Sequence, residues 1–117
     1  MKEKRKEERI FEEDKVVLSL VPEGNVPGSA ETYYSLTQDI SAGGVRIITD
    51  SPLPVDSNVR FEIALSKTRR LVHGIGKVRW LNRLYEDGVF EVGLEFLELG
   101  PEGVGAILEN IYRHDGA

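Results

Sequence analysis

The stretch "VRFEIAL", residues 59–65, alternates large apolar residues with smaller or charged ones. Val59, Phe61, Ile63 and Leu65 share one face of an extended chain, because successive side chains of a β-strand point to opposite faces. Such a run predicts a half-buried strand whose apolar face covers a hydrophobic core.

Five further segments have strand character. They are "VVLSLV" (16–21), "AETYYSLTQ" (30–38), "VRIIT" (45–49), "RLVHGIGKVRWL" (70–81) and "VFEVGLEFLEL" (89–99). Gly74 and Gly76 predict a bulge or bend in the fourth of these. Six short strands separated by turn residues predict an all-β fold, either an antiparallel sandwich or a small barrel. Closure into a barrel would remove the unpaired edges of so small a sheet.

The end of the chain changes character at Pro101. Apolar residues then follow at helical spacing, namely Val104, Ile107, Leu108 and Ile111. This spacing predicts an amphipathic helix over residues 101–114 that packs on the strands. We therefore expect one body over residues 15–117, preceded by a charged, mobile arm over residues 1–14.

The charge of the 117-residue chain is unevenly placed. The net charge is −5, yet residues 1–9 sum to +2, so the remainder carries −7. An acidic body argues against broad binding of a nucleic acid polymer, which needs a basic face. The chain has no cysteine and no apolar run long enough to span a membrane, so we expect a cytoplasmic protein without disulfides.

Arg5 and Arg9 form an R-x-x-x-R pattern in the arm. A guanidinium is a planar fork that can clamp a phosphate or donate to the O6 and N7 atoms of guanine. A solvated charged terminus is the alternative explanation of these residues.

A second pattern, D-x-S-x-x-G, runs from Asp39 through Ser41 to Gly44. An ionised Asp offers acceptors for the N1–H and N2–H donors of guanine. Gly43 and Gly44 permit positive φ and the close approach of a ligand to the main chain. A turn between two strands is the alternative, since Asp, Ser and Gly all favour turns.

Together, the two patterns in this order resemble the PilZ domain, the bacterial receptor module for cyclic di-GMP. The segments "DISAGGVRI" (39–47), "GIGKVRWL" (74–81) and "YEDGVFEVGLEF" (85–96) extend the resemblance over nearly the whole chain. The resemblance implies a six-stranded antiparallel β-barrel of the split-barrel type with a C-terminal helix. It also implies a protein that binds the second messenger without transforming it.

Carried over by position, the resemblance implies a ligand site with two walls. Arg5 and Arg9 would hold guanine and phosphate, and Asp39, Ser41 and Gly44 would line the opposite wall. Lys4 stands directly before the first arginine, a position that in the family influences whether one ligand or a stacked pair binds, and stoichiometry stays open. We add Gly43, which lies within the second pattern, and Arg46, which follows it, as candidate ligand contacts.

No pattern points to catalysis or to a metal. His73 and His114 are far apart in sequence, and no cluster of His, Asp or Glu has metal-ligand spacing. Trp80 is expected in the core, and stacking on a base is the alternative reading of this residue. We expect a non-enzymatic receptor without a cofactor that presents an altered surface to an unidentified downstream protein, as a monomer or a homodimer. The alternatives are a PilZ-like barrel that acts only through protein contacts and a barrel that binds single-stranded nucleic acid.

Overall fold

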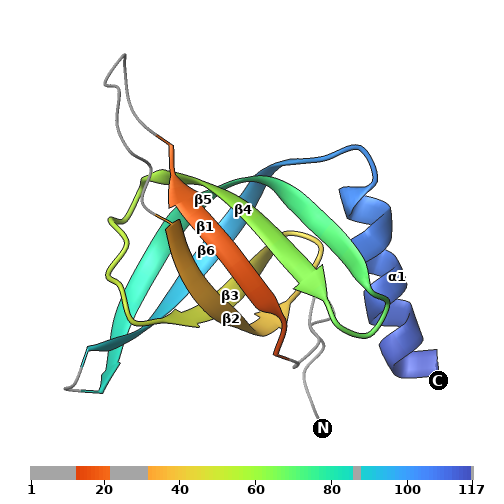
Figure 1. Cartoon of the computed structure of the whole chain (residues 1–117), viewed down its shortest axis with the longest axis horizontal. Coiled ribbons are helices and arrows are strands. Elements are labelled where there is room, and N and C mark those ends of the chain that lie inside the picture. Colours follow the sequence, from red (N-terminus) through yellow and green to blue (C-terminus); the bar gives the residue numbers. More distant parts are fainter. Residues whose placement is uncertain (1–12, 22–31, 86–87, 117) are drawn as a thin grey trace, which may run out of the picture.

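A computed structural model of the chain describes residues 13–21, 32–85 and 88–116 (Figure 1). These residues form six strands and one helix. The elements are β1 (Lys15–Leu20), β2 (Thr32–Ile40), β3 (Gly44–Thr49), β4 (Asn58–Leu65), β5 (Arg70–Tyr85), β6 (Val89–Leu99) and α1 (Gly103–Gly116). The predicted arm over residues 1–14 lies outside the described residues up to residue 12.

The six strands close into a barrel in the order β1-β2-β3-β6-β5-β4, and β4 pairs back onto β1. Every neighbouring pair is antiparallel. Of the two architectures that the strand spacing allowed, the structure therefore has the barrel, and the fold class is as the resemblance implied. Closure pairs both sides of each strand and leaves no long free edge.

The barrel interior is filled by alternate residues of the strands. In β4 the four apolar residues of "VRFEIAL" are all buried and the residues between them are exposed, as predicted. Each such side chain contributes about 1.5–3 kcal/mol when fully buried. A slip of one residue would turn this whole set to solvent, so the apolar pattern fixes the strand register.

Strand β5 is longer than the sequence indicated. The predicted strand ended at residue 81, whereas β5 continues to Tyr85 and the reversal is made with Gly88 at a φ of 88°. The polar residues after Trp80 resemble a turn in sequence, but they pair with the first half of β6. The predicted irregularity at Gly76 is confirmed, because the pairing of β5 with β6 shifts between Ile75 and Gly76.

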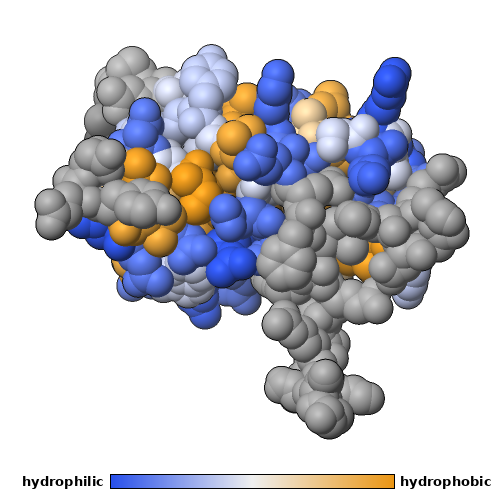
Figure 2. Space-filling model, turned by 90° about the horizontal axis from the view of Figure 1, so that it is seen from below, coloured by the Kyte–Doolittle hydropathy of each residue, from blue (hydrophilic) through white to orange (hydrophobic). Residues whose placement is uncertain are grey.

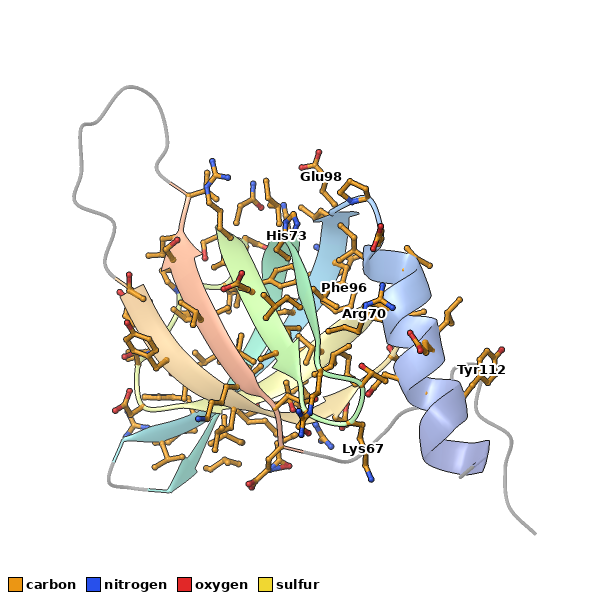
Figure 3. All side chains as sticks on the ribbon, turned by 45° about the vertical axis from the view of Figure 1, so that its right-hand side comes forward. Lys67, Arg70, His73, Phe96, Glu98 and Tyr112 are labelled. Carbon is orange, nitrogen blue, oxygen red and sulfur yellow. The ribbon has the colours of Figure 1, made fainter. Side chains whose placement is uncertain are left out.

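Helix α1 packs against the barrel and contacts β5 (Figure 1). Its buried residues are Gly103, Ala106, Ile107, Asn110 and Ile111. Arg70 of β5 ties the helix to the barrel through ion pairs with Glu102 and Glu109, and Figure 3 shows Arg70 beside the helix.

The orientation of α1 differs from the prediction at two positions. The apolar spacing put Val104 and Leu108 on the packed face, but they are 53% and 37% exposed. The small residues Gly103 and Ala106 occupy that face instead. They let the helix approach the barrel closely, since a Cβ at position 103 would press on the Leu99 side chain.

Candidate functional site

The D-x-S-x-x-G pattern forms the connection between β2 and β3. The Ser41 amide donates to the Gly44 carbonyl oxygen at 2.9 Å, which closes the hairpin. The Ser41 hydroxyl accepts a bond from the Gly43 amide and donates one to the Gly44 carbonyl. Ser41 is fully buried, so its hydroxyl stabilises the turn, while Ala42 and Gly43 are exposed at the tip.

Gly44 owes its identity to packing rather than to backbone conformation. Among the described residues, positive φ values occur at Gly88, Asp56 and Arg69, and not at the two glycines of this turn. A Cβ at position 44 would lie less than 3.0 Å from the backbone carbonyl oxygen of Leu94. The missing side chain therefore lets β3 approach β6.

A β-bulge turns the Asp39 side chain to the outer side of the barrel wall. Thr37 pairs with Ile47 and faces the interior, but the next pair on β2 is Asp39 with Arg46, so one extra residue stands on β2. A bulge shifts the alternation of inward and outward side chains by one position. Asp39 consequently lies on the outer side of the barrel wall beside Arg46, where its own side chain is buried, while Gln38 before it is exposed and Ile40 after it is buried.

Arg46 is held by two carboxylates. It forms an ion pair with Asp39 of β2, and its Nη1 atom lies 3.1 Å from Glu91 Oε2 of β6. The Asp39 side chain is 3% exposed, whereas that of Arg46 is 33% exposed. The Nε atom of Arg46 is buried without a hydrogen-bond partner among the described residues. The two carboxylates thus fix the guanidinium in place.

Trp80 lies on the outer side of the barrel near Arg46. The prediction that it belongs to the core was therefore wrong. The side chain is 39% exposed. Pairing shifts between Val78 and Trp80, and this second bulge turns the indole outward. Trp80 pairs with Gly93, which pairs with Arg46, and the indole edge covers Gly93 so closely that no Cβ would fit there.

Across four neighbouring strands, β2, β3, β6 and β5, the outer side of the barrel wall therefore carries a row of a carboxylate, a guanidinium and an indole. We call this row, Asp39, Arg46 and Trp80 together with Glu91, the outer cluster. Sequence reasoning named Asp39 and Arg46 but missed Glu91. Its alternation with Val92 could have placed Glu91 on the outer face of β6. That it lies near Arg46 follows only from the register of β3 with β6.

The three cationic candidates Lys4, Arg5 and Arg9 lie outside the described residues. The described chain joins the barrel at Asp14, whose amide donates to Thr37 Oγ1 and whose carbonyl accepts from the Thr37 amide. The Asp14 carboxylate is buried and accepts a bond from the Ser66 amide at 2.9 Å. Asp14, assigned to the arm by sequence, is thus fixed to β2 only two residues from Asp39.

Other kinds of site were sought in the same part of the chain. No group of three or more His, Cys, Asp or Glu among the described residues is placed to hold a metal ion. None of the helices formed by the described residues is long and apolar enough to cross a membrane.

Known structures share this fold. One is the inhibitor of motility MotI/DgrA from Bacillus subtilis, with a TM-score of 0.75 and 20% sequence identity over 97% of this chain and 52% of the other. Another is the PilZ domain of YcgR from Escherichia coli, solved with c-di-GMP. It has a TM-score of 0.69 and 12% identity over 97% of this chain and 92% of that domain. The chain spans about half the length of the motility inhibitor.

The comparison with curated protein sequences gives no match. The family model of the PilZ domain matches residues 3–113, which is almost the entire chain, and the match includes both sequence patterns. The chain therefore belongs to the PilZ domain family.

Proposed function

We propose that this protein is a receptor for cyclic di-GMP that grips the ligand between its N-terminal arginines and the outer cluster. The observation that carries the proposal is the attachment of Asp14 to Thr37, beside Asp39. Family membership and the structural likeness to a PilZ domain solved with c-di-GMP support the choice of ligand.

Chain length allows the arginines to reach the cluster. Arg9 stands five positions before Asp14, and an extended chain advances about 3.5 Å per residue, so Arg9 can lie at most about 18 Å from that anchor. Arg5 has a reach of about 32 Å by the same measure. Asp14 is hydrogen-bonded to Thr37, and Asp39 is only two residues further along β2. The reach of each arginine from Asp14 is longer than this step, so the arm is long enough to cover a nucleotide bound beside Asp39.

Electrostatics favour the same arrangement. Among the described residues the outer cluster holds two carboxylates and one guanidinium, which gives it a net charge of −1. A cationic arm is attracted to such a cluster, and the two phosphates of the ligand need cations from the arm. Arg5, Arg9 and Lys4 would supply them, with Arg46 facing them from the barrel.

The barrel side of the proposed site recognises guanine. Asp39 would share its carboxylate between Arg46 and the N1–H and N2–H donors of the base. The exposed backbone at Gly43 would allow close approach, with Ser41 and Gly44 shaping the turn beneath it. The Trp80 indole offers a flat surface on which a purine can stack.

The consequence of binding would be a new surface made of arm, ligand and barrel, which a downstream protein reads. The protein would then act as an adaptor in second-messenger signalling in the cytoplasm and not as an enzyme. One structural neighbour is described as an inhibitor of motility, which is an output of this kind for that protein.

A fluorescence titration tests the proposal, because Trp80 is the only tryptophan of the chain. Stacking of guanine on the indole is expected to change its emission saturably as cyclic di-GMP is added. Cyclic di-AMP, which lacks the O6 acceptor and the N1–H donor, serves as the control and should have no effect. Emission that stays constant with cyclic di-GMP would favour the alternative, a PilZ barrel that works only through protein contacts.

A further inference from the structure

The outward face of β1, β2 and β3 carries an apolar surface that the ligand site does not use. Two rows of side chains lie on these strands. One row is Lys15, Leu36 and Ile48, and the next pairs Val17 with Tyr34, while Asp50 stands directly after β3 and lines the same groove. Tyr34, Leu36 and Val17 are 75%, 41% and 37% exposed, which is high for large side chains on a barrel surface.

These six residues, together with Val89, line a shallow groove of about 630 Å³. Figure 2 shows hydrophobic residues gathered left of the centre on the side of the molecule seen from below, with hydrophilic residues around them. Exposed apolar groups that adjoin one another in this way mark interaction sites more often than scattered single residues do.

The charges of the groove lie at opposite corners. Lys15 ends one row on β1 and Asp50 stands directly after β3, so the apolar side chains run as a diagonal between them. Neither residue forms an ion pair with any other residue that the structure describes. The Asp50 carboxylate accepts one bond from the neighbouring Ser51 hydroxyl.

This arrangement is complementary to itself. Consider a two-fold axis that lies in the plane of this surface and follows the line of apolar side chains that separates Lys15 from Asp50. Rotation about this axis places Lys15 of each molecule opposite Asp50 of the other, so the dimer contains two such contacts. Such an isologous pairing is the commonest way in which soluble proteins form dimers. We propose that the surface formed by Lys15, Val17, Tyr34, Leu36, Ile48 and Asp50 binds a second copy of this chain.

The balance of charge distinguishes this occupant from others. A nucleic acid or an anionic lipid surface would require an excess of positive charge around the groove. Here one lysine faces one aspartate across an apolar centre. The dimer surface also lies beside the outer cluster and not over it, because the pair Leu36–Ile48 and the pair Asp39–Arg46 are successive outward-facing pairs of β2 and β3.

Charge reversal tests the pairing. Sedimentation velocity of the intact chain over a concentration series is expected to show a monomer–dimer equilibrium. Lys15→Asp and Asp50→Lys, each alone, create two like-charge contacts per dimer and should raise the dimer dissociation constant at least about tenfold. An equimolar mixture of the two variants restores both attractive contacts, so the mixture should associate again.

Lys67→Asp is the matched control for Lys15→Asp, because Lys67 is exposed on the turn between β4 and β5 and the substitution makes the same change in net charge. It should leave the dissociation constant unchanged, and circular dichroism should show the barrel intact in every variant. A chain that stays monomeric at all concentrations overturns the proposal. So does a mixture of the two single variants that fails to associate.

Discussion

Replacing Arg9 by alanine is expected to weaken cyclic di-GMP binding by about a hundredfold. A guanidinium bound to a phosphate or to guanine makes two charge-assisted hydrogen bonds, each contributing about 1.5–3 kcal/mol. Loss of both gives at least about 3 kcal/mol, and each 1.4 kcal/mol corresponds to about a factor of ten in affinity. Isothermal titration calorimetry of the intact chain and the variant measures the difference.

Two further variants separate the fork from the charge. Arg9→Lys keeps the positive charge but not the planar pair of donors, so its affinity should fall between those of the other two proteins. Arg60→Ala removes an exposed arginine from β4, away from the outer cluster, and should bind as the unaltered chain does. If Arg9→Ala bound as tightly as Arg60→Ala, the arm would have no part in recognition.

Replacing Gly44 by alanine is expected to cost about 3 kcal/mol of folding free energy. The added Cβ would overlap the Leu94 carbonyl oxygen, which belongs to a paired strand and cannot rotate away. Forcing atoms into such a contact costs about 1–3 kcal/mol and occasionally more. For a chain of this size the loss corresponds to a fall in Tm of about 12 °C, measurable by thermal denaturation.

Gly105→Ala is the matched control for this substitution. Gly105 is an exposed position of α1, and nothing lies within 4 Å of a Cβ built there. Alanine in a helix is more favourable than glycine by about 0.5–1 kcal/mol, so the Tm of this variant should be slightly higher than that of the unaltered chain. Equal melting temperatures of the two variants would show that β3 and β6 tolerate the extra atom.

The fold could be predicted because each strand has a recognisable pattern in its own local sequence. The alternation of "VRFEIAL" is an unbroken period of two, and the structure buries the four residues that this period selects. What could not be predicted are the interruptions of that period. The bulges before Asp39 and before Trp80 reverse the face of each residue, and no residue type near them demands an extra position.

The candidate site was predictable in its residues but not in its contacts. The order of charged and turn residues named Asp39 and Arg46, yet their ion pair depends on the register of β2 with β3. The role of Glu91 depends in turn on β6 lying between β3 and β5, an order that no local pattern encodes. The same holds for Gly44, whose neighbour Leu94 is fifty residues away in sequence.

The most direct test of the central claim is a titration of the isotopically labelled intact chain with cyclic di-GMP, followed by amide NMR. We predict that the resonances of residues 2–11 and of the turn from Ile40 to Val45 shift together and saturate at the same ligand concentration. Amides at the opposite end of β6, around Leu99 and Gly100, should stay unchanged. Shifts confined to that far end, or no shifts at all, would contradict a site formed by the arm and the outer cluster.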